Sequence, residues 1–110
     1  RLPFGRTVTV GVVADEFFDQ RITRMGGFGF STRMVGNIWR AHPEAGVRVV
    51  YVVVSPSARI DGRRYAQEET QVHGWPLVNL WTRAEGGGKS TDWTAEYMRR
   101  RRVDLLLFID

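Results

Sequence analysis

Residues 47–54 read VRVVYVVV, an apolar run that only Arg48 interrupts. Six of its eight residues are valine, and β-branched side chains favour strands over helices. A strand with one face in water alternates apolar and polar residues. In this run both sets of alternate positions are mainly apolar. It therefore predicts a strand that is buried on both faces, as in a parallel sheet with helices on each side.

Three more apolar runs predict strands of the same sheet. They cover residues 7–13, 77–81 and 103–109, and we expect the last, which reads VDLLLFI, to be a buried central strand. Residues 28–42 and 92–102 instead repeat their apolar residues with the period of an amphipathic helix. The order strand, helix, strand, strand, helix, strand predicts an α/β fold, a Rossmann-like parallel sheet with flanking helices.

Size and composition limit the architecture further. A chain of 110 residues fits one domain, residues 1–110. It has no cysteine, and its two histidines cannot form a zinc site alone, so we expect no disulfide, metal site or cofactor. No apolar run is long enough to span a bilayer and no secretory signal opens the chain. We therefore expect a cytoplasmic protein without stable membrane insertion.

The positive net charge comes from one segment. The chain carries 16 Lys and Arg against 12 Asp and Glu, which gives +4, and four of the basic residues are the run 99–102. Without that run the counts are equal, 12 against 12. Basic residues at the end of a helix interact favourably with its dipole. The charge therefore does not predict a nucleic-acid partner.

The segment after the first predicted strand, residues 14–33, is acidic at its start and rich in glycine later. Ligands of parallel α/β sheets bind at the carboxyl ends of the strands, so we expect functional residues here. Gly26, Gly27 and Gly29 introduce the first helix. Glycine lets the backbone approach a ligand closely, and the N–H groups of a helix start attract an anion. The same glycines could instead form a tight turn and pack the helix onto the sheet, and the residues alone leave both interpretations open.

Two phosphate-binding motifs are incomplete in this chain. The dinucleotide fingerprint G-x-G-x-x-G begins at Gly27 and Gly29 but meets Thr32 at its third glycine position. The P-loop, G-x-x-x-x-G-K-[ST], matches at residues 88–90 but has Arg83 at its first glycine position. The second match favours a flexible glycine loop that ends in a serine helix cap.

Residues 15–53 read DEFFDQRITRMGGFGFSTRMVGNIWRAHPEAGVRVVYVV. A glycine loop, a helix and the turn HPEAGV at residues 42–47 follow one another and lead into the second strand. This succession resembles the N-terminal portion of bacterial glycosyltransferases of the GT-B fold, the retaining, glycogen-synthase-like group. Residues 102–110, RVDLLLFID, are similar to a later strand of the same domain. The resemblance covers most of the chain and is weak over residues 55–90.

The resemblance implies an activity. Enzymes of this group transfer a sugar from a nucleotide-diphosphate sugar to an acceptor without an Asp-x-Asp metal site, so protein donors must stabilise the charge of the leaving group. By analogy, the glycine loop would approach the donor phosphates or the acceptor, nearby carboxylates would bind acceptor hydroxyls, and a last aspartate would point toward the same crevice. The residues so assigned are Gly26, Gly27, Gly29, Asp15, Glu16, Asp19 and Asp110.

In this group the donor nucleotide binds chiefly to a C-terminal domain. We therefore expect the chain to be an incomplete GT-B N-terminal domain that continues past Asp110, is inactive alone, and leaves the catalytic residues unassigned. Two other functions stay open: a non-catalytic Rossmann-like binding module, and, less favoured, a P-loop nucleotide binder that uses Lys89. His73 could make a polar contact in the cleft, but we favour a loop histidine that is held by packing of Trp75 and Pro76.

Overall fold

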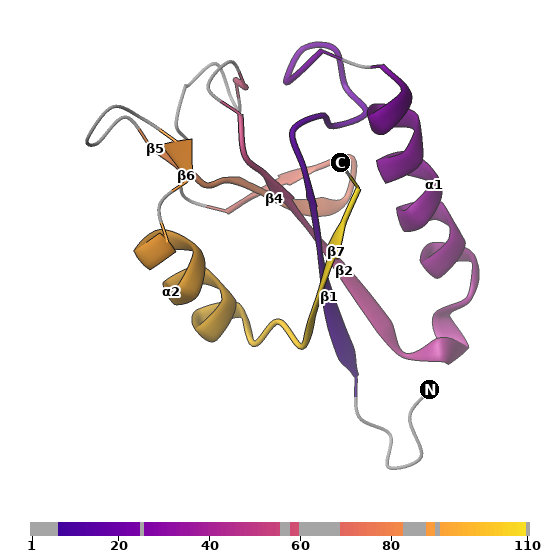
Figure 1. Ribbon diagram of the computed structural model, residues 1–110. Coiled ribbons are helices and arrows are strands. Elements are labelled where there is room, and N and C mark those ends of the chain that lie inside the picture. Colours follow the sequence, from indigo (N-terminus) through magenta and orange to yellow (C-terminus); the bar gives the residue numbers. More distant parts are fainter. Residues whose placement is uncertain are drawn as a thin grey trace.

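The computed structural model describes residues 7–24, 26–55, 58–59, 69–82, 88–89 and 91–109 (Figure 1). The helices and strands in chain order are β1 (Val8–Ala14), α1 (Gly27–Ala41), the 3-10 turn η1 (Pro43–Ala45), β2 (Val47–Val53), β3 (Thr70–Val72), β4 (Trp75–Asn79), β5 (Trp81–Thr82), β6 (Gly88–Lys89), α2 (Thr91–Arg101) and β7 (Leu105–Phe108).

Five strands form one sheet in the order β3-β4-β2-β1-β7. β1 runs parallel to β2 and to β7, and β2 runs parallel to β4, whereas β3 joins the edge antiparallel to β4. β5 and β6 form a separate antiparallel pair. The predicted α/β fold is confirmed, and the mostly parallel sheet with two helices is consistent with a Rossmann-like fold.

Each face of the sheet carries its own apolar cluster, and Figure 1 shows the two helices on opposite sides of the sheet. Val49, Tyr51 and Val53 of β2 belong to the cluster on the α1 side, and Val50 and Val52 belong to the one on the α2 side. The valine run is thus buried on both faces, as predicted.

The two helices begin and end within one residue of the predicted ranges. Val35 and Trp39 of α1 pack against one cluster, and Tyr97 and Met98 of α2 contribute to the other. The expected serine cap, Ser90, lies outside the described residues.

Helix α1 approaches the sheet closely at Gly36. The buried Tyr51 hydroxyl of β2 donates a hydrogen bond to the backbone oxygen of Thr32 in α1, at 2.6 Å. A Cβ atom on Gly36 would collide with this hydroxyl and would lie 3.0 Å from Cζ2 of Trp75. Burial raises the pKa of Tyr51, which keeps the hydroxyl protonated as a donor.

The prediction for residues 103–109 is right about the strand and wrong about its place. β7 pairs with β1 at the edge of the sheet and is not a central strand. Its four side chains are between 40% and 61% exposed. An apolar run predicts a strand, but it does not specify whether that strand has a neighbouring strand on one side or on both sides.

Candidate functional site

The loop between β1 and α1 packs down on the α1 side of the sheet. Phe17 and Ile22 are buried in the same apolar cluster as Tyr51. The hydroxyl of Thr23 accepts a hydrogen bond from the backbone N–H of Phe17, at 2.7 Å, which ties the two ends of the loop together. Burial of Phe17 and Ile22 therefore holds this mainly polar loop against the sheet.

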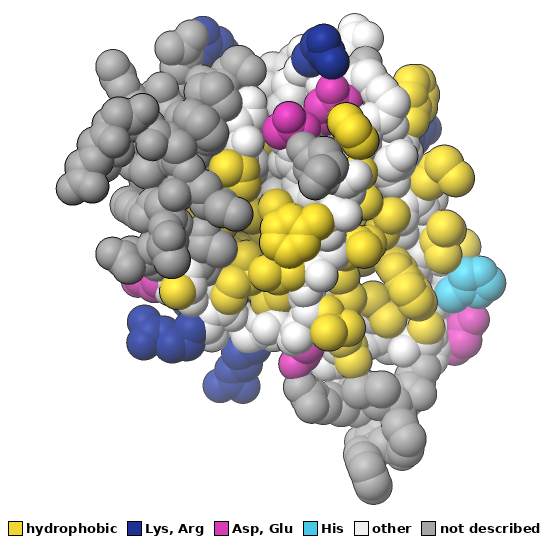
Figure 2. Space-filling view, viewed as in Figure 1, with side chains coloured by type: hydrophobic (Ala, Val, Ile, Leu, Met, Phe, Trp, Pro, Cys, Tyr) yellow, Lys and Arg dark blue, Asp and Glu magenta, His cyan; other side chains and the backbone are white. Residues whose placement is uncertain are grey.

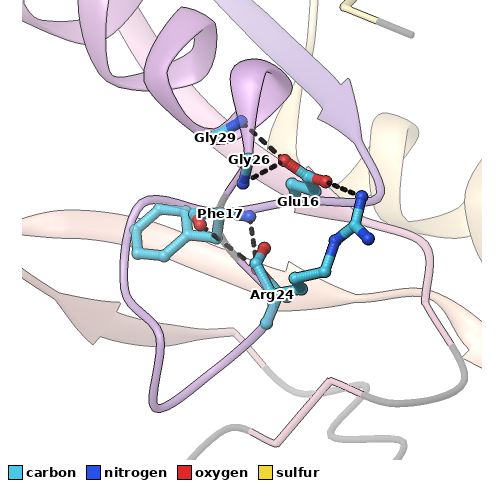
Figure 3. Close-up of polar contacts among 6 residues, drawn as sticks. Glu16, Phe17, Arg24, Gly26 and Gly29 are labelled. Carbon is cyan, nitrogen blue, oxygen red and sulfur yellow. Dashed lines mark hydrogen bonds and ion pairs between the residues drawn. The ribbon is translucent and has the colours of Figure 1, made fainter.

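Glu16 connects this loop to the amino end of α1 (Figure 3). Its Oε1 atom accepts hydrogen bonds from the backbone N–H groups of Gly26, at 2.8 Å, and Gly29, at 2.9 Å, while Nη2 of Arg24 lies 3.4 Å from Oε2. The first N–H groups of a helix have no partner inside the helix, and the helix dipole favours negative charge there. Gly26 has no side chain with which to cap the helix. The Glu16 carboxylate supplies the missing cap from ten residues upstream.

The same contacts favour the ionised carboxylate. The backbone N–H of Gly26 makes the largest contribution and lowers the pKa of Glu16, burial of the side chain opposes it, and Gly29 and Arg24 lower the pKa further. Glu16 is only 7% exposed. The amino end of α1 is therefore already occupied by a buried negative charge.

The predicted glycine loop lies at this point, after the carboxyl end of β1. The N–H groups of Gly26 and Gly29, which an external anion would use, bind Glu16. A Cβ atom on Gly26 would lie 3.3 Å from both carboxylate oxygens, so packing gives a reason for glycine there. Gly27 is different, because it is exposed and a Cβ atom on it would meet nothing within 4 Å. Gly27 therefore borders open space, and Asp15, which follows β1 directly, is exposed as well.

Asp19 makes a different set of contacts from Glu16. Its Oδ2 atom lies 2.7 Å from Nη2 of Arg21 and 2.9 Å from Nε2 of His73, and its Oδ1 atom accepts a hydrogen bond from the backbone N–H of Arg21. The Arg21 side chain is the largest cause of the lowered pKa of Asp19, burial opposes it, and the Arg21 backbone and His73 lower it further. Asp19 is therefore a buried, ionised anchor for the β3–β4 hairpin.

The hairpin turn positions His73 for this contact. His73 and Gly74 form the two-residue connection between β3 and β4, with φ of 54° and 77°. Positive φ at both residues is the geometry of a type I′ turn, which matches the twist of the flanking strands. The prediction that packing of Trp75 and Pro76 holds His73 in place did not include the contact of His73 with Asp19. A histidine-glycine pair between two strand segments was the available signal for the turn.

A hollow of about 390 Å³ opens beside the Asp19–His73 pair. Its lining residues are Asp19, Arg21, Ile22, Arg59, Gln71, Val72 and His73. This volume lies within the range of small-molecule sites. A larger hollow of about 570 Å³ lies near the starts of β2 and β4, the end of the strands that open α/β sheets do not normally use for ligands.

The remaining predictions fall partly outside the described residues. Asp110 lies outside them, and so do residues 83–87 of the incomplete P-loop. Lys89 lies in β6, where it pairs with Trp81 of β5.

Among the residues that the structure describes, no three His, Asp or Glu side chains are grouped closely enough to hold a metal ion. In the same part of the chain, neither helix has the length and apolar character needed to cross a membrane. Comparison with models of protein families, with curated proteins and with solved structures finds no match to this chain.

Proposed function

We propose that the chain is the acceptor-side part of the N-terminal domain of a bacterial, cytoplasmic GT-B glycosyltransferase, which moves a sugar from a nucleotide-diphosphate sugar to an acceptor. Support comes from the resemblance of residues 15–53 and 102–110 to that group, and from a mostly parallel sheet of the expected type. The observation that carries the proposal is the contact of Glu16 with the N–H groups of Gly26 and Gly29.

This contact favours an acceptor over the donor diphosphate as the ligand of the glycine loop. A diphosphate at the start of α1 would compete with Glu16 for the same N–H groups, and Asp15 and Glu16 would repel it. Hydroxyl groups have the opposite preference, because carboxylate oxygens accept their hydrogen bonds. Asp15 would bind such a hydroxyl, and the bare surface at Gly27 would let a sugar ring approach the backbone.

The donor would then bind mainly to a second domain. The role of this chain would be to hold the acceptor hydroxyl in reach of the donor sugar, since fixed orientation removes a large entropic part of the barrier. Charge on the departing diphosphate would be stabilised by positioned donors of the second domain. The proposal assigns no catalytic residue, metal ion or cofactor to this chain.

A non-catalytic binding module is the second candidate. The hollow beside Asp19 and His73 favours it, because Arg59, Gln71 and the ion-paired Asp19 offer hydrogen-bond donors and acceptors to a small hydroxylated ligand without any second domain. A P-loop function has less support, since Arg83 stands at the first glycine position of the motif.

Ligand binding to this chain tests the acceptor assignment. The probes are glucose, mannose and maltose as acceptors, and UDP-glucose and ADP-glucose as donors, each titrated while protein NMR signals are recorded. We expect a sugar to shift the signals of Asp15 and Gly27, and we expect the nucleotides to shift neither. Gly27→Val should abolish the sugar response, because the new side chain fills the open surface. Asn37→Val, an exposed change in the same helix, is the matched control.

Two results would contradict the proposal. The first is a nucleotide-diphosphate sugar that binds at the start of α1 of the isolated chain. The second is a parent gene that ends near Asp110, because transfer needs a second Rossmann-like domain. In a longer parent enzyme, Gly27→Val should strongly reduce transfer and leave the thermal midpoint nearly unchanged.

A further inference from the structure

The parallel pairing of β2 with β4 does not reach the amino ends of the two strands. Its first pair is Tyr51 with Leu77, and the residue before Leu77 is Pro76. Proline has no N–H group with which to continue the ladder. The hollow of about 570 Å³ lies here, lined by residues 47–49 of β2 and by Trp75 and Pro76 of β4. Open α/β sheets usually bind ligands at their other end, but in this sheet the early end of the ladder leaves room between two neighbouring strands.

One wall of the hollow is apolar. Trp39 of α1, Val47 and Val49 of β2, and Trp75 of β4 line it, and all four belong to the apolar cluster on the α1 side of the sheet or pack against it. Trp75 is buried, whereas Trp39 is half-buried and keeps part of its ring accessible. This wall therefore offers an apolar surface to the flat ring of a ligand.

The rest of the lining is basic. Arg40, Arg48 and Arg101 border the hollow, and no Asp or Glu does so among the described residues. Arg101 is ion-paired, with its Nε atom 2.9 Å from Oε1 of Glu69. Within the part of the chain that the structure describes, no carboxylate is paired with Arg40 or Arg48. These two full charges outweigh the partial negative charge at the carboxyl end of α1, which also lies here.

Arg40 is held in a fixed geometry. Its guanidinium carbon lies 3.6 Å from the centroid of the Trp75 ring, and its Nη2 atom lies 3.4 Å from the backbone oxygen of Gly74. A side chain that is already ordered loses less conformational entropy when it binds a ligand. The planar guanidinium can bind a carboxylate or a phosphate through two parallel hydrogen bonds. Arg40 is therefore prepared for an anionic group.

The surface around the hollow is basic as well. The carboxyl end of α2 lies at the same end of the sheet and carries Arg99, Arg100 and Arg101 in its last turn (Figure 1). Figure 2 shows Lys and Arg side chains at the lower edge of the molecule, below the position of α2 in Figure 1. Clustered positive charge raises the local concentration of anions and their rate of association.

We infer that this hollow binds a small organic anion in which a flat apolar ring is joined to a carboxylate or a phosphate. The ring lies against Trp39, and the anionic group contacts Arg40 and Arg48. The volume of the hollow lies within the range of small-molecule sites. The site is at the opposite end of the sheet from Asp15 and Gly27, so the inference does not depend on the proposed glycosyltransferase activity.

Titration of the 110-residue chain with phenyl phosphate, followed by protein NMR, tests the inference. We expect the signals of Arg48 and of the Trp39 side chain to shift and those of Gly27 to stay unchanged. Phenol has the ring without the charge, and inorganic phosphate has the charge without the ring, so each should bind about tenfold more weakly. Benzoate carries a carboxylate instead: tighter binding than phenyl phosphate would identify a carboxylate ligand, and weaker binding a phosphate.

Two matched variants separate the site from the overall charge. Arg48→Gln removes an unpaired charge from the hollow and should weaken binding about tenfold. Arg33→Gln removes the same charge from an exposed position of α1 that does not line the hollow, and it should leave binding unchanged. Circular dichroism checks that both variants are folded.

Three results would overturn the inference. The first is that millimolar phenyl phosphate shifts the signals of neither Trp39 nor Arg48. The second is that phenol or inorganic phosphate binds as tightly as phenyl phosphate. The third is that Arg33→Gln weakens binding as much as Arg48→Gln, because the attraction would then come from net charge and not from the hollow.

Discussion

Replacing Gly36 by alanine tests the closest contact between α1 and the sheet. The added methyl group would collide with the Tyr51 hydroxyl and would lie 3.0 Å from the Trp75 ring. Tyr51 has little room to move, because it is 1% exposed and its ring packs edge-on against Phe17 and Trp75. Its hydroxyl is also tied to the backbone oxygen of Thr32, at 2.6 Å.

Three terms set the size of the effect. Overpacking of a core costs about 1–3 kcal/mol. A displaced Tyr51 hydroxyl would be a buried donor without its acceptor, at a cost of about 1–3 kcal/mol. Alanine gains about 1 kcal/mol over glycine within a helix. We expect Gly36→Ala to lower the free energy of unfolding by about 2–3 kcal/mol, which corresponds to a decrease in Tm of about 10 °C for a domain of this size.

Urea and thermal unfolding, followed by circular dichroism, measure this effect. Gly27→Ala is the matched control, because it is the same substitution in the same helix where a Cβ atom meets nothing within 4 Å. Its unfolding free energy should be equal to or slightly above that of the wild type. In a Tyr51→Phe background, where the colliding oxygen is absent, Gly36→Ala should cost clearly less. The reasoning is refuted if Gly36→Ala is as stable as Gly27→Ala, or if its cost is the same in both backgrounds.

Two further predictions concern the loop carboxylates. Because the folded-state pKa of Glu16 lies below its ordinary value of 4.5, its stabilising effect is complete above that pH and is lost as the pH falls through the folded-state value. Glu16→Gln should therefore have a lower urea midpoint than the wild type at neutral pH, and the difference should shrink on acidification; a difference independent of pH would contradict this. Asp19→Asn should likewise destabilise the chain at neutral pH and shift the NMR signals of His73 and Arg21, and unchanged His73 signals would exclude the hairpin contact as its cause.

The parts of the fold that were predictable are those whose residues carry a periodic pattern. The valine run of β2 and the helical period of α1 each specify an element that tertiary contacts then bury. β3 was missed, because three residues that include Thr70 and Gln71 have no apolar pattern, and antiparallel pairing with β4 alone makes them a strand. The pattern of apolar residues indicates which face of a helix or strand is buried. It does not indicate that a short polar segment will pair with the edge strand of a sheet.

The site was less predictable, because its contacts link residues across loops. The acidic start of the loop was visible in the sequence, but the contact of Glu16 with Gly26 and Gly29 depends on how Phe17 and Ile22 pack. One signal was available: a helix that begins with glycines lacks the usual capping side chain. Such a helix start indicates a carboxylate from elsewhere, and Glu16 is a near candidate.

The cap made by Glu16 has a consequence for any ligand at the start of α1. An anion could reach the N–H groups of Gly26 and Gly29 only by displacing a buried carboxylate, which would lose two charge-assisted hydrogen bonds and the favourable interaction with the helix dipole. In the proposed acceptor complex, a neutral polyol would contact Asp15 and Gly27 and would leave the cap in place. The interaction that stabilises α1 therefore also disfavours a phosphate at the N–H groups of Gly26 and Gly29.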